Sequence, residues 1–202
     1  MTRSAPVATR AHVASRWDGW RRSLRDFSLG LTGIEIKTTL SDSARHTIHG
    51  IHQVSAQPHE QRLLLVSVGI QFVDVPHQNT QSIVRLIDQI CGLIDSSAAD
   101  VTYRTDFLEH VRLYGSEVQR GYDHSAMRES LIFAAPFEVK WVRSYDMSDP
   151  EIKVLRPGDV AGFVHVDTKS LTYSLTLPEH VHGDINPVHG LGKLAEAIQA
   201  DL

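Results

Sequence analysis

The sequence of 202 residues lacks the features that would assign it to several common classes of protein. Its single cysteine, Cys91, excludes an internal disulfide and suits a reducing compartment, so we expect a cytoplasmic location. No run approaches the roughly 20 apolar residues of a membrane span, and no association with a membrane is expected. A glycine-rich phosphate loop, a Cys-x-x-Cys pair and a His-Glu-x-x-His helix are also absent. Their absence disfavours nucleotide hydrolysis, thiol redox chemistry and structural zinc clusters.

What the sequence does contain is a large share of hydrophobic residues, 42% of the total, which is enough to bury a core. We interpret residues 1–9 as a flexible tail and residues 10–202 as a single domain. Halves at residues 29–125 and 130–202 are an alternative division of the same domain.

Charge is distributed unevenly along the chain. The formal net charge is −4, but residues 1–28 carry six arginines and two aspartates, a net of +4 that leaves −8 for the remainder. A basic segment before an acidic body indicates either a partner surface or self-complementarity. Because the remainder is acidic, nucleic acid is not an expected partner.

The basic segment also has the pattern of an amphipathic helix. Apolar residues recur at steps of four and three, which places them on one stripe: Val13, Trp17, Trp20, Leu24 and Phe27. This stripe packs either on the protein's own sheet or on a second copy or another protein, with tryptophans as anchors. The candidate partner-binding residues are Trp17, Trp20, Arg21 and Arg22.

Several segments have the pattern of strands. Residues 34–38 alternate, with Ile34 on one face and Glu35 and Lys37 on the other. Further strands are predicted at residues 46–55 and 63–75, and the second of these has a continuous apolar face on alternate residues.

The second half of the chain continues this mixed pattern. A helix is predicted from Asn79 or Thr80, with Cys91 among its buried residues, and residues 101–132 remain ambiguous. A strand follows around Phe137, then a hairpin of residues 160–166 with 171–177, and a short helix from about Leu191. We therefore predict an α+β fold with a mainly antiparallel sheet covered by helices, in an order that allows two similar βββα halves.

Histidines concentrate near the end of the chain, where His180, His182 and His189 lie close to Asp184. On an extended segment His180 and His182 point to the same side, with Cα atoms roughly 7 Å apart. They could bind one divalent metal ion, with Asp184 or His189 as a third ligand. The alternative is an exposed loop of solvated histidines.

The same stretch, Gly183-Asp-Ile-Asn-Pro-Val-His189, resembles the signature of MaoC-like (R)-specific enoyl-CoA hydratases. The resemblance implies a hot-dog fold in which Asp184 and His189 are catalytic and activate water for addition to an enoyl thioester. In that family a long helix and further strands follow the motif, whereas 13 residues follow His189 here.

A second constellation is Asp123 followed by Glu138-Val-Lys140. It resembles the carboxylate and Glu-x-Lys arrangement of metal-dependent nucleases of the PD-(D/E)xK group. The resemblance implies that Asp123 and Glu138 hold Mg²⁺ while Lys140 activates the attacking water. Glu-x-Lys also occurs as Glu35-Ile-Lys37 and Glu151-Ile-Lys153, because an amphipathic strand with opposite charges generates this pattern.

Taken together, the residues predict first a non-catalytic α+β protein that binds or assembles, as a homo-oligomer or with another protein through its N-terminal helix. The second hypothesis is an enzyme that uses His180, His182, Asp184 and His189, either around a divalent metal or as acid and base in the manner of the hydratases. The third is a Mg²⁺-dependent nuclease. A divalent metal is thus the candidate cofactor of the metal-dependent alternatives.

Overall fold

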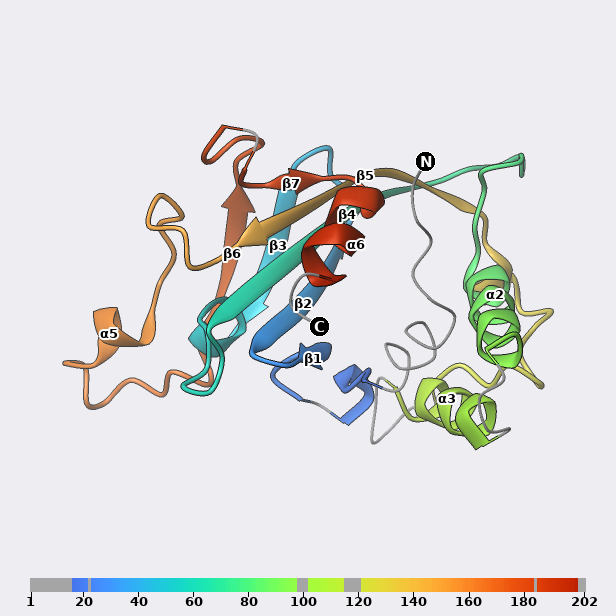
Figure 1. The fold of residues 1–202 in the computed structure, drawn as a ribbon, viewed down its shortest axis with the longest axis horizontal. Coiled ribbons are helices and arrows are strands. Elements are labelled where there is room, and N and C mark those ends of the chain that lie inside the picture. Colours follow the sequence, from blue (N-terminus) through green and yellow to red (C-terminus); the bar gives the residue numbers. More distant parts are fainter. Residues whose placement is uncertain (1–15, 22, 98–101, 115–120, 184, 200–202) are drawn as a thin grey trace. The chain divides into compact units, whose positions relative to one another are not determined.

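The structure of the protein is a computed structural model (Figure 1) that describes residues 16–21, 23–97, 102–114, 121–183 and 185–199. The chain divides into two compact units, which are described separately: Met1–Ser23 with Phe72–Glu138, and Leu24–Gln71 with Val139–Leu202. No helix in the described ranges is long and apolar enough to cross a membrane.

The described strands form two sheets. The five-stranded sheet has the order β1-β2-β4-β5-β7, and β3 pairs with β6 in a two-stranded sheet. Their bounds are β1 Phe27–Leu29, β2 Thr32–Thr39, β3 Ala44–His49, β4 Arg62–Phe72, β5 Phe137–Asp146, β6 Thr172–Leu177 and β7 Val188–His189.

Helices connect and cover these strands. The short helical turns of the described residues are η1 Gly19–Arg21, η2 Ile51–Val54, α4 Leu131–Ala134 and α5 Pro157–Val160. The longer helices are α2 Ile83–Asp95, α3 Thr102–Leu113 and α6 Leu191–Gln199.

The predicted α+β fold with a mainly antiparallel sheet is confirmed. β1 with β2, β5 with β7 and β3 with β6 are antiparallel pairs, whereas β2 and β4 are parallel. β4 and β5 also run antiparallel, because Met147 N donates to Leu63 O at one end and Val73 N to Pro136 O at the other.

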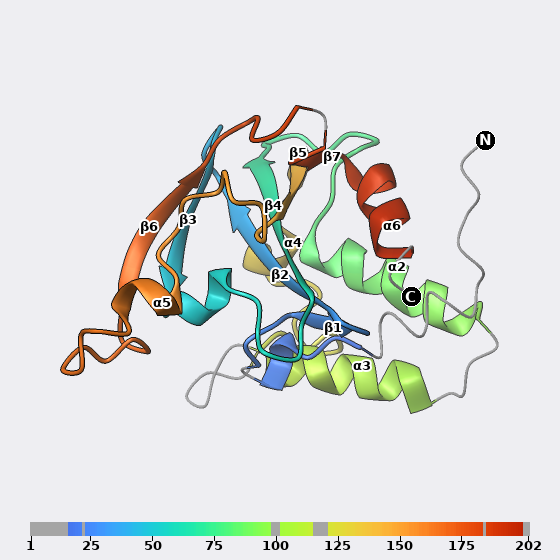
Figure 2. The same ribbon diagram turned by 60° about the vertical axis from the view of Figure 1, so that its left-hand side comes forward.

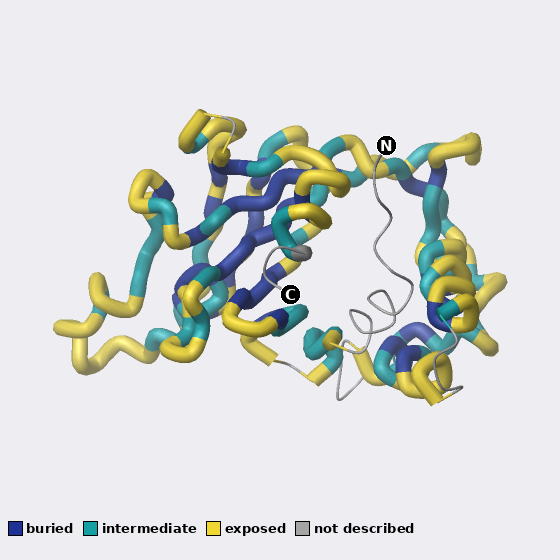
Figure 3. The backbone as a smooth tube through the Cα atoms, in the orientation of Figure 1, coloured by how far each residue is buried: buried dark blue, intermediate teal, exposed yellow. Residues whose placement is uncertain are grey.

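Both faces of the central sheet are covered within the unit of Leu24–Gln71 and Val139–Leu202 (Figures 2 and 3). Alternate residues of β4 face opposite sides. Leu64 and Val66 pack under α6 with Ile34. Leu63 and Leu65 face the sheet of β3 and β6, in a core completed by Ala44, Ile48, Val54, Tyr145, Met147, Ile152, Leu175 and Leu177.

The other unit has a helical core. α2 begins after Ser82, whose side chain accepts from Arg85 N as an N-cap, a few residues later than predicted. Ile87, Cys91 and Ile94 are buried, and they pack with Phe107 and Val111 of α3. The predicted burial of Cys91 is confirmed, and burial raises the pKa of its thiol.

The predicted hairpin of residues 160–177 is wrong, although its turn is present, since Ser170 N donates to Asp167 O. β6 pairs instead with β3, with His46 opposite Leu175. The first arm is exposed, with Val164 81% accessible. Alternate residues of β3 are buried, so β6 gains an apolar surface by pairing with it. The side chains of residues 160–166, in contrast, are mostly exposed.

The predicted helix along the N-terminal stripe is wrong in its described part, because η1 spans only three residues and Phe27 belongs to β1. Val13 and Arg22 lie outside the described residues. The tryptophans pack on α3: between ring centroids, Trp17 lies 6.2 Å from Phe107, and Trp20 stacks on His110 at 3.9 Å. Arg21 lies over the Trp20 ring.

Candidate active site

A pair of carboxylates lies on the hairpin of β1 and β2. The register of the two strands ends at Phe27 opposite Ile34, and Asp26 directly precedes this pair. Asp26 N donates to Ile34 O at 3.0 Å, and Ile36 N donates to Asp26 Oδ2 at 2.7 Å. The charge of Asp26 acts on Glu35, so the two carboxylates lie near each other at the edge of β2.

Lys37 lies on the same face as Glu35, since it is two residues further along the strand. Its Nζ is 2.9 Å from Glu35 Oε1. The residue between them, Ile36, is 39% exposed, whereas Glu35 is 6% exposed. The charged face of this strand is therefore the enclosed one, which is the reverse of an ordinary amphipathic strand.

The environment disfavours the charged form of both carboxylates. Burial raises the pKa of Asp26, and the Ile36 N–H and Lys37 offset only part of this rise. Burial also raises the pKa of Glu35; Lys37 opposes the rise and the charge of Asp26 adds to it. Two partly dehydrated carboxylates beside each other favour a bound cation, which would compensate both charges.

A buried ion pair fixes the backbone that precedes Asp26. Arg25 Nε and Nη2 donate to the Glu60 carboxylate, each at 2.8 Å. Burial alone would raise the pKa of Glu60, but hydrogen bonds from Arg25 and Gln57 N hold it below its ordinary value. Gly33 is required here, because a Cβ at this position would overlap Glu60 Oε1. The pair thereby anchors the start of β1.

Polar groups from other elements surround Lys37. Its Nζ donates to Gln53 Oε1 at 3.2 Å. Ser67 of β4 lies opposite Lys37 in the parallel register and bonds His46 Nε2 at 2.7 Å. His46 is buried, and burial, with the nearby charge of Lys37, lowers its pKa to about 4. His46 is therefore neutral at physiological pH.

The donor set of this face fits Mg²⁺ or Mn²⁺. Hard oxygen ligands suit these ions, and Mg²⁺ is commonly held by one or two carboxylates together with water and substrate phosphates. In the described part of the chain, no group of three or more histidine, cysteine, aspartate and glutamate side chains could hold a metal ion. Asp26 and Glu35 would thus supply two ligands and leave the remaining positions to water and substrate.

The C-terminal histidines are exposed: His180 and His182 lie in the loop after β6, and His189 ends β7. The rings of His180 and His189 are 5.9 Å apart between centroids, and His182 Nδ1 lies 3.8 Å from Asp149 Oδ2. Asp184 lies outside the described residues. The assignments of a metal site to His180, His182 and His189, and of catalysis to Asp184 and His189, stay predictions.

Asn186, within the same motif, has a structural role. It is buried, and its amide bonds the backbone of Asp146 and the carboxylate of Asp149. The motif is therefore tied at this position to the turn after β5.

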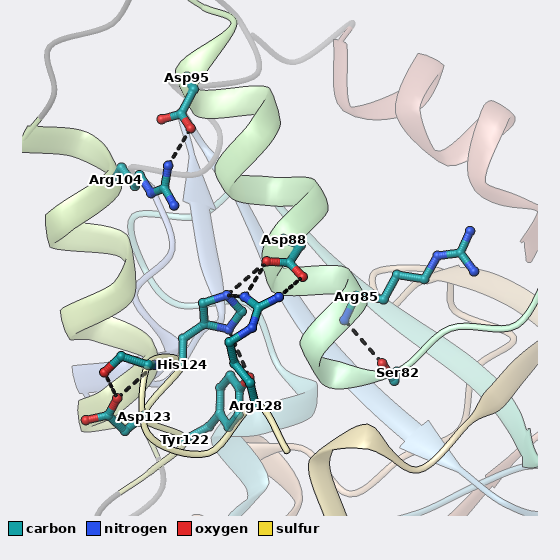
Figure 4. A network of polar contacts seen from close by, with 10 residues as sticks. Ser82, Arg85, Asp88, Asp95, Arg104, Tyr122, Asp123, His124 and Arg128 are labelled. Atoms are coloured by element: carbon teal, nitrogen blue, oxygen red, sulfur yellow. Dashed lines mark hydrogen bonds and ion pairs between the residues drawn. The ribbon is translucent and has the colours of Figure 1, made fainter. Parts of the chain in front are cut away.

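The residues of the predicted nuclease constellation are engaged in other contacts. Asp123 closes its own turn by accepting from Ser125 and Ala126, next to a network in which Asp88 binds Arg128 and His124 (Figure 4). Glu138 Oε1 bonds His77 Nε2 at 2.7 Å. Sequence reasoning noted Glu35-Ile-Lys37 only as a recurrence and missed Asp26. The signal that could have identified it was an aspartate at the start of a short hairpin, opposite a Glu-x-Lys strand.

Comparison with known proteins places the chain in a family. Residues 4–129 match the model of a family described as "Putative PD-(D/E)XK family member, (DUF4420)". This match covers more than half of the sequence, and the chain belongs to this family. No curated protein and no solved structure matches the chain. The match includes Asp26, Glu35 and Lys37 and ends before Glu138.

The expectation of a non-catalytic binding or assembly protein is wrong, because the family points to the nuclease hypothesis instead.

Proposed function

We propose that this member of the PD-(D/E)XK family is a metal-dependent nuclease that hydrolyses phosphodiester bonds with Asp26, Glu35 and Lys37. One observation supports the proposal above others. Two partly dehydrated carboxylates, Asp26 and Glu35, lie near each other and near the Lys37 ammonium at the β1–β2 hairpin, inside the segment that matches the family.

Each residue would have a distinct role. Asp26 and Glu35 would bind a divalent cation, which supplies Lewis-acid polarisation of the phosphate when bound. The Lys37 ammonium would donate to the attacking water or to a phosphate oxygen that gains negative charge in the transition state. Glu35 also orients this ammonium, since it accepts from Lys37 Nζ.

The two other Glu-x-Lys sequences are poorer candidates. Glu151 is exposed and lies in a turn, and Lys153 Nζ donates to Pro150 O. Glu138 is bonded to His77, and Lys140 is exposed. Glu35-Ile-Lys37 combines burial of its glutamate with a second carboxylate across the hairpin.

The decisive experiment is cleavage of single-stranded and double-stranded DNA and of RNA by the full chain with Mg²⁺ or Mn²⁺. We expect turnover that EDTA abolishes. Asp26→Asn, Glu35→Gln and Lys37→Met should each lower the rate by at least about 100-fold, because each removes a group that acts on the reacting phosphate. The assay also tests the expectation that nucleic acid is not a partner.

Matched controls are Glu151→Gln and Lys153→Met, which make the same chemical changes in the exposed Glu-x-Lys sequence. These variants should cleave like the unmodified chain. Equal rates for Glu35→Gln and Glu151→Gln, or intact nucleic acid with every metal, would refute the proposal.

A further inference from the structure

Two acceptors hold the Lys37 ammonium. One is Glu35 Oε1 at 2.9 Å, and the other is Gln53 Oε1 at 3.2 Å. The same Gln53 oxygen also accepts the backbone N–H of His49 at 3.0 Å. An amide oxygen has two acceptor positions, and both are used here. The Gln53 side chain is therefore fixed by the backbone of β3 while it binds Lys37.

The backbone that carries Gln53 is anchored as well. Gly50, with φ of 79°, turns the chain from β3 into η2, and Gln53 N donates to Gly50 O. Ile51 and Val54 on either side of Gln53 are buried, at 1% and 0% exposure. Rotation of η2 would expose both side chains, so the position of Gln53 is determined by the core.

The segment around η2 also reaches the other side of the candidate site. His52 O accepts from Arg25 Nη1 at 3.0 Å, and Ser55 O accepts from Arg25 Nη2 at 2.7 Å. Arg25 directly precedes Asp26. One short segment thus contacts both the lysine and the residue that holds the first carboxylate in place.

We propose that Gln53 is a positioning residue, which holds the Lys37 ammonium beside Glu35 through a neutral acceptor. The proposal rests on the proposed function and names a residue that acts through Lys37. Neutrality matters because two carboxylates, Asp26 and Glu35, already lie near this ammonium. A third carboxylate would compete for the ammonium, whereas an apolar side chain would release it.

The test compares Gln53→Met, which removes the acceptor at similar volume, with Gln53→Glu, which keeps an acceptor oxygen and adds a charge. Gln78→Glu, in an exposed loop, is the charge-matched control. For Gln53→Met we expect kcat to fall on the order of tenfold with little change in KM. For Gln53→Glu, which keeps an acceptor oxygen for Lys37, we expect kcat to fall less than for Gln53→Met, and for Gln78→Glu we expect no change.

NMR relaxation of the Lys37 side chain, measured at its Cε, provides a readout that needs no turnover. In Gln53→Met the Lys37 side chain should become more mobile, and in Gln78→Glu it should not. Unchanged Lys37 mobility in Gln53→Met, or full kcat in Gln53→Met, would overturn the positioning role even if the chain is a nuclease. Increased mobility in a chain that cleaves nothing would support the position of Gln53 and refute the nuclease.

Discussion

The β1–β2 hairpin and the C-terminal histidine loop, residues 180–189, differ in how closeness in the sequence relates to closeness in space. The loop has three histidines within ten residues, yet His180, His182 and His189 are exposed. On the hairpin, Asp26 and Glu35 are nine positions apart, and the turn between β1 and β2 brings them near each other and near Lys37. The more organised site therefore forms where two strands meet, and the closeness of residues in the sequence did not reveal it.

Burial adds to this difference. Glu35 and His46 are buried beside Lys37, where their ionisation costs free energy, and the nearby Arg25 is held by several hydrogen bonds. Groups with perturbed pKa values and fixed geometry are typical of functional sites. The histidines themselves are exposed, and the segment is tied to the core by other residues, such as Asn186 and Val181.

The largest expected effect is the loss of stability in Gly33→Ala, which tests how much the buried Arg25–Glu60 ion pair contributes to the hairpin site. A Cβ at Gly33 would overlap Glu60 Oε1 and approach Arg25 Nε to 2.7 Å, so the two side chains have to shift. Because hydrogen bonds to His52 O and Ser55 O hold Arg25 in place, we expect the shift to break the buried pair, at a cost of about 3–5 kcal/mol. We expect a loss of this size in the free energy of unfolding, measured by urea denaturation.

Gly192→Ala in α6 is the control for this substitution, because no atom lies within 4 Å of a Cβ there. It should be neutral or stabilising by up to about 1 kcal/mol, since alanine favours a helix. Equal stabilities of the two variants would show that the Arg25–Glu60 pair can shift at no cost.

The next expected effect is a rise in melting temperature on metal binding. It distinguishes the hairpin from the histidine loop, because the two regions prefer different metal ions. Carboxylates suit Mg²⁺ and Mn²⁺, whereas imidazoles suit Zn²⁺. A ligand at 100 times its Kd stabilises the native state by about 2.7 kcal/mol. We expect Mn²⁺ to raise the melting temperature of the unmodified chain and of His180→Gln, but not of Asp26→Asn.

Zinc titration by calorimetry gives the converse experiment. Binding that disappears in His180→Gln and His182→Gln but persists in Asp26→Asn would establish the predicted histidine site as a second centre. A Mn²⁺ shift that persists in Asp26→Asn would remove the hairpin from consideration as the metal site.

The sequence predicted local periodicity well and distant partners poorly. The alternation of β2 and β4 and the burial of Cys91 follow from residues a few positions apart, and these predictions are confirmed. The partner of β6 depended on comparing it with β3, about 130 residues earlier, and the adjacent segment was chosen wrongly. Local patterns determine which face a residue occupies, but not which strand covers it.

The same limit explains the candidate site. Glu35 and Lys37 were correctly placed on one face of the strand, but the local pattern did not indicate that this face is enclosed. Burial of that face depends on η2 and β4, which provide Gln53 and Ser67. Asp26 was missed because its role depends on the β1–β2 register, and Phe27 was assigned to a helix.

The smallest of the expected effects concerns His46, which tests whether the hairpin site is as enclosed as its geometry indicates. The pKa of His46 is lowered to about 4 by burial and by Lys37, and a hydrogen bond to the Thr38 backbone offsets only part of this. Between about pH 6.5 and pH 4 the unfolded chain therefore binds more protons than the native state. The stabilising contribution is complete above about pH 6.5 and is lost as the pH falls towards 4.

At pH 5 this loss should reach about 1–2 kcal/mol relative to pH 7. Because carboxylates also contribute in acid, the measurement is a comparison of urea denaturation at both pH values for the unmodified chain and for His46→Gln. The variant should lose less stability between pH 7 and pH 5, since glutamine does not titrate. Parallel losses in the two proteins would mean that water reaches His46, and the enclosed face beside Lys37 would then be open to solvent.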